Sequence, residues 1–383
     1  MARPYPGRVT KPGGRPGRRG YDLGVTPHPL ELYRVAGSHR EVGMQMGELG
    51  ADQIRRSIEA FDEKLPQGRT HEEQLRLATA YRDATAPSLS WLLDELDGCA
   101  EGAAVDPLAF FASTIEELWS TPSPSRTEGR CSDVVAGPAA TADGHLWVGH
   151  TNDLHPDVEP DIVAIEKRVT DEPTILQIGG VPWISVGWNQ AGLSLTGNEV
   201  SPNDERVGVS RSHQVFEMLR ARNLHEMVAD AIRPDRASSY NNVLADRYGD
   251  VANVEGSATD VEISHLDEGD HLVHTNHYVS ERMRPYEGDP EYAARSDVRM
   301  GRARDLLAGQ APGSVTPETL RTILSDHENQ PNEICRHPEF GHPTSKTVFW
   351  CTADVTEGRI MFGRGNPCDS MAQEYVFADY GVA

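Results

Sequence analysis

The apolar residues of this chain change their spacing about a third of the way along. Between residues 30 and 119 they recur every three or four positions, most clearly over 39–65 and 72–103, and this period predicts helices. A further helix is predicted where Asp106 can cap the first turn and Pro107 suits the first helical position. The first third of the chain is therefore expected to be helical.

The segment 121–130 separates this helical region from the rest of the chain. It is rich in Pro and Ser, which is typical of an exposed linker. Beyond it the period becomes two, which predicts short strands divided by Gly, Pro and Asp turns. The predicted strands cover 132–137, 144–151, 161–169, 173–180, 192–197, 240–256, 260–266, 271–279, 347–355, 359–365 and 374–381, and helices are predicted at 210–232, 295–308 and 316–327. This order predicts an α+β protein whose sheets are covered by helices.

The composition argues against several classes of protein. A net charge of −23 argues against a nucleic-acid partner, because phosphate recognition needs a basic face. No apolar run approaches the roughly 18–20 residues of a membrane helix, so no membrane partner is expected. The five cysteines are scattered and odd in number, which argues against a disulfide framework and favours a reducing, cytoplasmic location.

Residues 1–29 differ from the rest of the chain. The first twenty contain six basic residues and no acidic ones, together with much Pro and Gly. They lack the apolar stretch of a secretory signal. We expect a disordered basic tail, with an arm for nucleic acid or another anionic partner as the alternative.

Cys131 opens the first predicted strand directly after the linker. A thiol needs a nearby base or a lowered pKa to act as a nucleophile, and no neighbour in the sequence is an obvious base. If the Arg130–Cys131 bond were cut, the new α-amine, with an ordinary pKa of roughly 7.7–8.0, would lie within reach of the thiol. One residue would then supply both nucleophile and general base. The thiol itself can make the cut by attacking the Arg130 carbonyl; the alternative is a buried structural cysteine.

Several motifs along the chain resemble one family of acyl-transferring enzymes. They are GRCSDVVAGPAATADGHLWVGHTND (129–153), GWNQAGLSLTGNEV (187–200), HTNHY (274–278), SDVRMGR (296–302), ICRH (334–337) and GNPC (365–368), with YRVAGSHREVGMQMGE (33–48) upstream. Together they are similar to the acyl-coenzyme A:6-aminopenicillanic acid acyltransferase family of N-terminal nucleophile hydrolases. The resemblance covers the chain from about residue 30 to its end.

The resemblance implies a four-layer αββα fold and a precursor that cuts itself. The tail of residues 1–29 and a helical part at 30–130 would form the α-chain, and residues 131–383 the catalytic β-chain. The mature protein would be an α/β heterodimer, with a higher homo-oligomer left open.

The resemblance also assigns roles to individual residues. Cys131 matches the nucleophile and cleavage point, Asp153 the acid that organises it, and Asn276 the amide whose NH₂ stabilises the oxyanion of acyl transfer. The family often carries Asn two residues before the acid, where this chain has Thr151. The candidates for substrate binding are His150, Thr151, Ser296, Arg299 and Arg302.

Each of these residues also has an ordinary structural interpretation. Asp153 could cap the turn before Pro156, and Asn276 could serve a turn at the end of a strand. Arg299 and Arg302 are three apart on a predicted helix and could form a solvated, salt-bridging face.

No metal or other cofactor is expected. A metal site could combine His150, His274 and His277 with Cys335, His337 and His342, but the spacing of the last three matches no familiar zinc pattern. Packing or hydrogen-bonding histidines are the preferred interpretation. Cys335, Cys351 and Cys368 are expected to be core thiols near strand ends.

The sequence thus predicts a self-cleaving cysteine hydrolase that acts on the amide of a small acylated amine through an acyl-enzyme thioester. An acyl-CoA-dependent N-acyltransferase, which would take an acyl thioester, is the alternative within the family. Two other classes stay open: an uncleaved, non-catalytic binding protein on the same fold, and a metal-dependent amidohydrolase.

Overall fold

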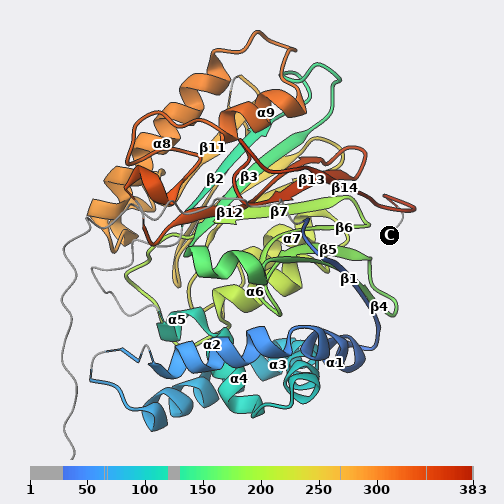
Figure 1. Ribbon diagram of the computed structural model, residues 1–383, viewed down its shortest axis with the longest axis vertical. Coiled ribbons are helices and arrows are strands. Elements are labelled where there is room, and N and C mark those ends of the chain that lie inside the picture. Colours follow the sequence, from blue (N-terminus) through green and yellow to red (C-terminus); the bar gives the residue numbers. More distant parts are fainter. Residues whose placement is uncertain are drawn as a thin grey trace, which may run out of the picture.

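The computed structural model describes residues 29–63, 65–66, 68–119, 130–267, 269–341 and 343–381 (Figure 1). The expected basic tail, apart from residue 29, lies outside the described residues, as do nearly all of the linker and His342. Among the residues that are described, no helix combines the length and apolar character needed to cross a membrane.

The N-terminal part of the chain is mostly helical, as the spacing of its apolar residues predicts. Ser38 and Thr70 each form a capping box with a glutamate three residues later, and the Asp106 side chain caps the helix that begins at Pro107. The helices are α1 (His39–Leu49), α2 (Ala51–Glu63), α3 (His71–Ala103), α4 (Pro107–Thr114) and α5 (Glu116–Trp119).

Helices α1 and α3 cross with their backbones in close approach. A Cβ atom added at Gly43 of α1 would lie 1.9 Å from the Glu95 carbonyl oxygen of α3. One added at Gly98 of α3 would lie 2.3 Å from the Arg40 carbonyl oxygen of α1. The two glycines therefore allow a helix contact that any side chain would push apart.

The prediction of helix from residue 30 onward is wrong for one segment. Leu32–Gly37 forms strand β1, which pairs in parallel with β4 (Val163–Val169). The backbone N–H and C=O groups of β1 are paired with those of β4, which is far away in the sequence. The local spacing of apolar residues cannot reveal such a partner.

Two sheets form the centre of the molecule. The eight-stranded sheet has the order β1-β4-β5-β6-β7-β8-β9-β10, and the six-stranded sheet has the order β11-β2-β3-β12-β13-β14. Apart from β1–β4, the paired strands are antiparallel. The remaining strands are β2 (Arg130–Ala136), β3 (Trp147–Leu154), β5 (Ile175–Gly179), β6 (Ile184–Asn189), β7 (Leu193–Asn198), β8 (Asn241–Asp246), β9 (Val251–Gly256), β10 (Val261–Ser264), β11 (His271–His274), β12 (Lys346–Asp354), β13 (Arg359–Arg364) and β14 (Gln373–Val376).

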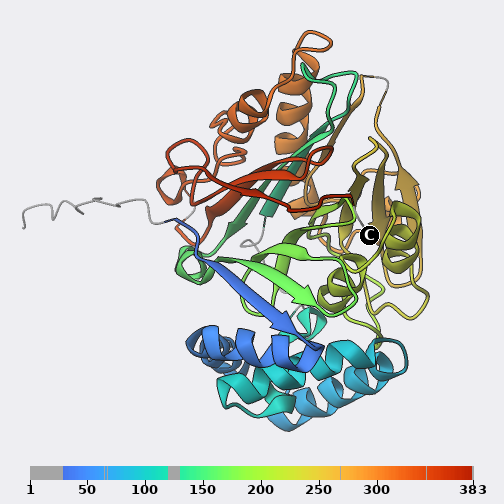
Figure 2. The same ribbon diagram turned by 90° about the vertical axis from the view of Figure 1, so that its right-hand side faces the viewer.

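Helices cover the outer face of each sheet, which gives the expected four-layer αββα architecture (Figures 1 and 2). Helices α8 (Pro290–Ala308) and α9 (Pro317–Leu324) lie on the six-stranded sheet. The N-terminal helices, with α6 (Arg211–Met218) and α7 (Leu224–Ala231), lie on the other side. Short 3-10 helices occur at Pro156–Asp161, Arg284–Tyr286 and Pro338–Phe340.

The alternation of side chains along β2 determines which residues face the space between the sheets. Val134 and Ala136 pack in a cluster with residues of α8 and α9. Val135 packs instead with Val243 of the other sheet. Because alternate residues of a strand share a face, Cys131 points inward like Val135.

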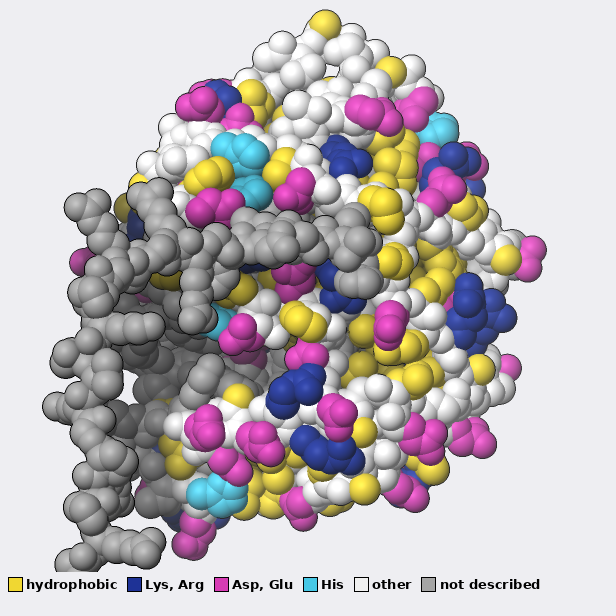
Figure 3. Space-filling view, in the orientation of Figure 1, with side chains coloured by type: hydrophobic (Ala, Val, Ile, Leu, Met, Phe, Trp, Pro, Cys, Tyr) yellow, Lys and Arg dark blue, Asp and Glu magenta, His cyan; other side chains and the backbone are white. Residues whose placement is uncertain are grey.

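Acidic side chains are spread over the face of the molecule shown in Figure 3. Lys and Arg side chains are scattered among them, and no continuous basic patch is visible on the described part of this face.

A polar contact joins the two sheets beside β11. His274 of the six-stranded sheet lies 2.9 Å from Asn198 Oδ1 and 3.0 Å from Glu255 Oε1, both on the eight-stranded sheet. The Glu255 carboxylate also accepts hydrogen bonds from the backbone N–H groups of Val279 and Ser280. The predicted strand 271–279 is shorter than expected: β11 ends at His274, and the Val279 N–H donates to Glu255 and not to a neighbouring strand.

We expect Glu255→Gln to weaken the fold chiefly above pH 5. Although burial opposes ionisation, the contact with His274 and the hydrogen bonds to Val279 and Ser280 lower the Glu255 pKa from 4.5 to about 2. A carboxyl with a lowered folded-state pKa contributes its full stability above 4.5 and loses it as the pH falls towards 2. The variant should lose about 3 kcal/mol of unfolding free energy at pH 7 and less than half of that at pH 3.

Urea unfolding at the two pH values measures this difference. Glu262→Gln, on the adjacent strand β10, is the matched control. The Glu262 side chain is partly exposed, and its ion pair with the exposed Arg282 is long, at 3.8 Å, so its charge should contribute little. An equal loss at both pH values would contradict the proposed role of the Glu255 charge.

Candidate active site around Cys131

Cys131 lines a cavity that is bounded by strands of both sheets and by helices α2, α3, α4 and α6. It is the second residue of β2 and pairs with Asn152 of β3, so both side chains face inward. Only 8% of Cys131 is exposed, and the cavity above it has a volume of about 430 Å³. The position expected for a nucleophile therefore faces a space large enough for a small molecule.

The wall of this cavity is mainly apolar. The apolar side chains that line it are Leu96, Phe110, Leu154, Val158, Val181, Pro182, Trp183, Ile184, Leu195, Val215 and Phe216. Among the described residues that line it, none is Lys or Arg. Its two carboxylates, Glu116 and Glu199, lie 3.0 and 3.3 Å from the buried guanidinium of Arg211. The cavity thus suits an uncharged, apolar group.

The thiol of Cys131 is in its neutral form in this environment. Burial raises its pKa well above the ordinary value, and the carboxylates of Asp133 and Asp153 raise it further against the opposing charge of Arg299. The Asn152 NH₂ group lies 3.5 Å from Sγ and donates a 2.7 Å hydrogen bond to Ser185 Oγ. The thiol has a polar neighbour here but needs a base to react.

The backbone nitrogen of Cys131 is held by Asn276, which follows β11. The Cys131 N–H donates to Asn276 Oδ1 over 2.8 Å, and Arg299 Nη2 donates to the same oxygen over 2.8 Å. Two donors on one atom fix which end of the amide is the carbonyl. The Asn276 NH₂ donates to the Glu199 carbonyl over 3.0 Å. In the continuous chain, Asn276 therefore contacts the Cys131 backbone through its oxygen.

Asp153 lies on the opposite face of β3 and pairs in register with Arg130. Its Oδ1 accepts a 2.6 Å hydrogen bond from Thr347, and its Oδ2 lies 3.6 Å from Arg299 Nη1 and 3.9 Å from Arg336 Nε. Arg299 is fully buried and connects Asp153 to Asn276. Asp153 is thus linked to the backbone of Cys131 through two intervening side chains.

Three of the substrate-binding candidates, Ser296, Arg299 and Arg302, lie on α8 and are called the Ser/Arg cluster. Their surroundings differ. Ser296 is buried and contacts Thr275 at 2.8 Å and His277 Nδ1 at 3.0 Å. Arg299 is buried beside Asn276, whereas Arg302 is partly exposed and pairs with Asp326 at 2.6 Å. The interpretation as a solvated, salt-bridging face therefore fits Arg302 but not Arg299, whose ion pair with Asp153 is fully buried.

His150 and Thr151 occupy opposite faces of β3. His150 faces the space between the sheets, where its Nδ1 lies 2.9 Å from Asp133 Oδ1. Thr151 is buried on the face towards α8 and α9. None of the five predicted substrate-binding residues is among the described residues that line the cavity. Four of the five make polar contacts within the protein, and the Thr151 side chain is buried.

The motifs in the sequence pointed to Thr151 and Asp153 and not to Asn152, although among the described residues Asn152 is the one whose side chain donates to the Cys131 thiol. The signal was present: in an antiparallel pair of inner strands, the residue opposite Cys131 shares its face, and residues 151 and 153 do not. Ser185 and Glu199 lie in other segments of the chain, and only the tertiary fold brings them into contact with Asn152 and Asn276.

Two sheets covered by helices on their outer faces, with an inward-facing cysteine near the start of an inner strand, agree with the fold expected from the family resemblance. The chain belongs to the acyl-coenzyme A:6-aminopenicillanic acid acyl-transferase family, whose sequence model matches residues 140–369, more than half of the chain. This confirms the family resemblance. The matched range begins after Cys131 and contains Asp153, Asn276 and the Ser/Arg cluster.

Known structures with a similar fold include two mutant forms of conjugated bile acid hydrolase from Clostridium perfringens. They are 11% and 12% identical to this chain, cover 65% of it and 98% of their own length, and have TM-scores of 0.42 and 0.43. Penicillin V acylase from Agrobacterium tumefaciens is 14% identical, with 65% and 79% covered and a TM-score of 0.38. A comparison with curated protein sequences found no match.

We expect Arg299→Met to destabilise the protein far more than Arg302→Met. Removing the buried Arg299 guanidinium leaves Asp153 and Asn276 without a shared partner, which typically costs about 3–5 kcal/mol. The partly exposed pair of Arg302 with Asp326 contributes at most about 1 kcal/mol. Urea unfolding of both variants measures the difference. Equal losses from the two arginines, one turn apart on the same helix, would contradict this assignment.

Proposed function

We propose that this protein is a self-cleaving cysteine amidohydrolase that removes a small apolar acyl group from an amine. Cleavage before Cys131 would give an α-chain of residues 1–130 and a β-chain of residues 131–383. The observation that supports this most directly is that Cys131 lines the cavity and that both its nitrogen and its sulfur contact an asparagine side chain. Its nitrogen contacts Asn276, and its sulfur lies beside Asn152.

The proposed self-cleavage uses the Cys131 thiol against the preceding peptide bond. Sγ attacks the Arg130 carbonyl carbon, the C–N bond breaks, and the Cys131 nitrogen leaves as an amine after taking up the thiol proton. Water then hydrolyses the thioester and frees the Arg130 carboxylate. Asn276 Oδ1 would hold the nitrogen before and after the cut, since an amine can donate to it as the amide does.

In the mature enzyme the α-amine would be the base that the neutral thiol needs. Its ordinary pKa of roughly 7.7–8.0 leaves a useful fraction unprotonated near neutral pH. It accepts the thiol proton as Sγ attacks the substrate carbonyl, and then donates a proton to the departing amine. Water resolves the resulting thioester and releases the acid.

The oxyanion of these steps needs hydrogen-bond donors in the cavity. The family resemblance points to the NH₂ of Asn276, which donates to the Glu199 carbonyl in the continuous chain. Asn152 offers a second NH₂ group on the same side of the sheet as the thiol. We propose that the Asn152 NH₂ group donates to the oxyanion and that Asn276 positions the α-amine. The Asn276 NH₂ group would also donate to the oxyanion once it turns away from the Glu199 carbonyl.

Amide hydrolysis is favoured over transfer from acyl-CoA by the lining of the cavity. A CoA phosphate would require basic side chains, and the described lining residues include neither Lys nor Arg. The family description keeps acyl transfer as the second candidate. We also propose a reducing, cytoplasmic environment, which would keep the catalytic thiol free.

Self-cleavage predicts two chains in purified wild-type protein. Intact-mass spectrometry should detect fragments that end at Arg130 and begin at Cys131, with masses that add up to the 42.1-kDa chain plus one water. Cys131→Ala should stay as one chain, whereas Cys99→Ala, which removes another buried thiol, should still be cut. An uncut wild-type chain with amidase activity would contradict the proposed base; an uncut, inactive chain without thiol reactivity would favour a binding protein.

The cavity also predicts a preference among acyl groups. With the cleaved enzyme, kcat/KM for linear acyl p-nitroanilides should rise about fourfold per added CH₂ until the cavity is full. The succinyl compound should react far more slowly than the butyryl compound of equal length, because its carboxylate would be buried without a cationic partner. A preference for the succinyl compound, or activity only with acyl-CoA donors, would overturn this assignment.

A further inference from the structure

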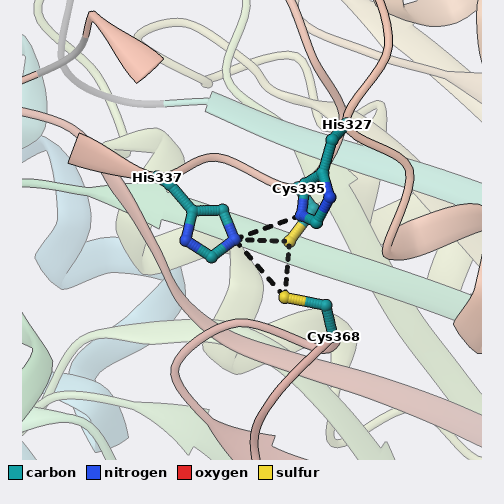
Figure 4. A group of neighbouring side chains, drawn as sticks. All are labelled: His327, Cys335, His337 and Cys368. Carbon is teal, nitrogen blue, oxygen red and sulfur yellow. Dashed lines mark hydrogen bonds between the residues drawn. The ribbon is translucent and has the colours of Figure 1, made fainter. Parts of the chain in front are cut away.

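Four side chains with metal-binding atoms meet outside the cavity: His327, Cys335, His337 and Cys368 (Figure 4). They come from three places in the chain. His327 follows α9, Cys335 and His337 lie in the segment before β12, and Cys368 lies in the turn after β13. Their ligand atoms all lie within 4.8 Å of one another.

Four of the distances between these atoms are close to the edges of a tetrahedron around zinc. The two sulfur atoms are 3.7 Å apart, and His337 Nε2 lies 3.5 Å from Cys335 Sγ and 3.3 Å from Cys368 Sγ. The Nε2 atoms of His327 and His337 are 3.2 Å apart. With Zn–S near 2.3 Å and Zn–N near 2.05 Å, a regular tetrahedron requires about 3.8 Å for S–S, 3.5 Å for S–N and 3.3 Å for N–N.

We propose that His327, Cys335, His337 and Cys368 bind one zinc ion in a four-coordinate structural site. Two thiolates and two neutral imidazoles around Zn²⁺ give a centre with no net charge. Binding would release the two thiol protons to solvent. Because all four positions are filled by protein, the ion would have no open position for substrate or water, and its role would be structural.

The groups around the cluster suit a metal centre. Asn366 Nδ2 lies 3.4 Å from Cys335 Sγ, close enough for the N–H···S contact that often supports a metal thiolate. Glu339 Oε1 lies 3.5 Å from His337 Nδ1, which favours a proton on that nitrogen and leaves Nε2 for the ion. Phe340 packs against both imidazole rings. Ligand orientation is thus determined by neighbouring side chains.

The ion would connect this segment to the catalytic side of the sheet. Arg336 lies between Cys335 and His337; its backbone N–H donates to Thr347 Oγ1 over 2.9 Å, and its guanidinium approaches Asp153. Thr347 in turn donates to Asp153. Binding zinc would fix the segment that carries Arg336 to the turn containing Cys368. The proposed site therefore supports the side chains behind Arg130 and Cys131.

The expectation of core thiols needs revision for two cysteines. Cys335 is buried but Cys368 is exposed, and both belong to the cluster. A Cys335–Cys368 disulfide is the competing use of this pair. The separation of 3.7 Å is far longer than the 2.03–2.05 Å of an S–S bond.

Elemental analysis of the full chain tests the proposal. Protein produced in zinc-supplemented medium is purified with a reductant and without chelator, and its zinc and free thiols are then measured. We expect one zinc per chain in the wild type and in Cys99→Ala. Zinc should be almost absent from Cys368→Ser, which alters an exposed side chain, and from His327→Asn. Cobalt(II) replacement should give the visible spectrum of a tetrahedral thiolate site in the wild type only.

A second measurement separates this result from the proposed catalytic activity. Cys131→Ala should also bind one zinc, since the cluster does not include the nucleophile. Adding a strong chelator should lower the melting temperature of the wild type but not that of Cys368→Ser. The proposal is wrong if reduced wild-type protein binds no zinc, if both cluster variants retain it, or if Cys335 and Cys368 remain disulfide-bonded under these conditions.

Discussion

The buried guanidinium of Arg299 is the contact on which the candidate site depends. It binds the carbonyl oxygen of Asn276 on one side and faces the carboxylate of Asp153 on the other. A carboxylate and a guanidinium this far from water are tolerated only together, because either one alone would carry a large desolvation cost. The pair fixes Asn276, and Asn276 fixes the backbone of Cys131. The position of Cys131 is thus set by charges that do not touch its thiol.

Much of the fold could be predicted from the sequence because local patterns determine it. The spacing of apolar residues and the caps at Ser38, Thr70 and Asp106 specify the N-terminal helices. Alternation specifies most strands, but β1 was predicted as helix and β6 was not predicted at all. Strand β1 occurs where pairing with a distant strand, rather than a local signal, determines the backbone conformation. Strand β6 pairs with β5 and β7, its neighbours in the sequence.

The site could be predicted less completely, for a related reason. Motif order pointed to Cys131, Asp153 and Asn276, and the structure brings these residues together through Arg299. The sequence could not say which end of the Asn276 amide faces the nucleophile, because Arg299 decides it from another element. Cys335 and His337 were considered as metal ligands, but packing was preferred because their spacing with His342 follows no familiar pattern. His327 and Cys368 were not considered as ligands, because they come from other segments.

Strand β1 has a consequence for how the molecule must be made. It covers the edge of β4, and just before it Gln373 exchanges two hydrogen bonds with the backbone of Leu30. A catalytic segment synthesised alone would leave the β4 edge and its hydrophobic neighbours open to other chains, and exposed strand edges promote aggregation. The N-terminal segment therefore protects this edge of the sheet from pairing with other chains. Translation as one continuous polypeptide would deliver that protection before the proposed cut at Cys131.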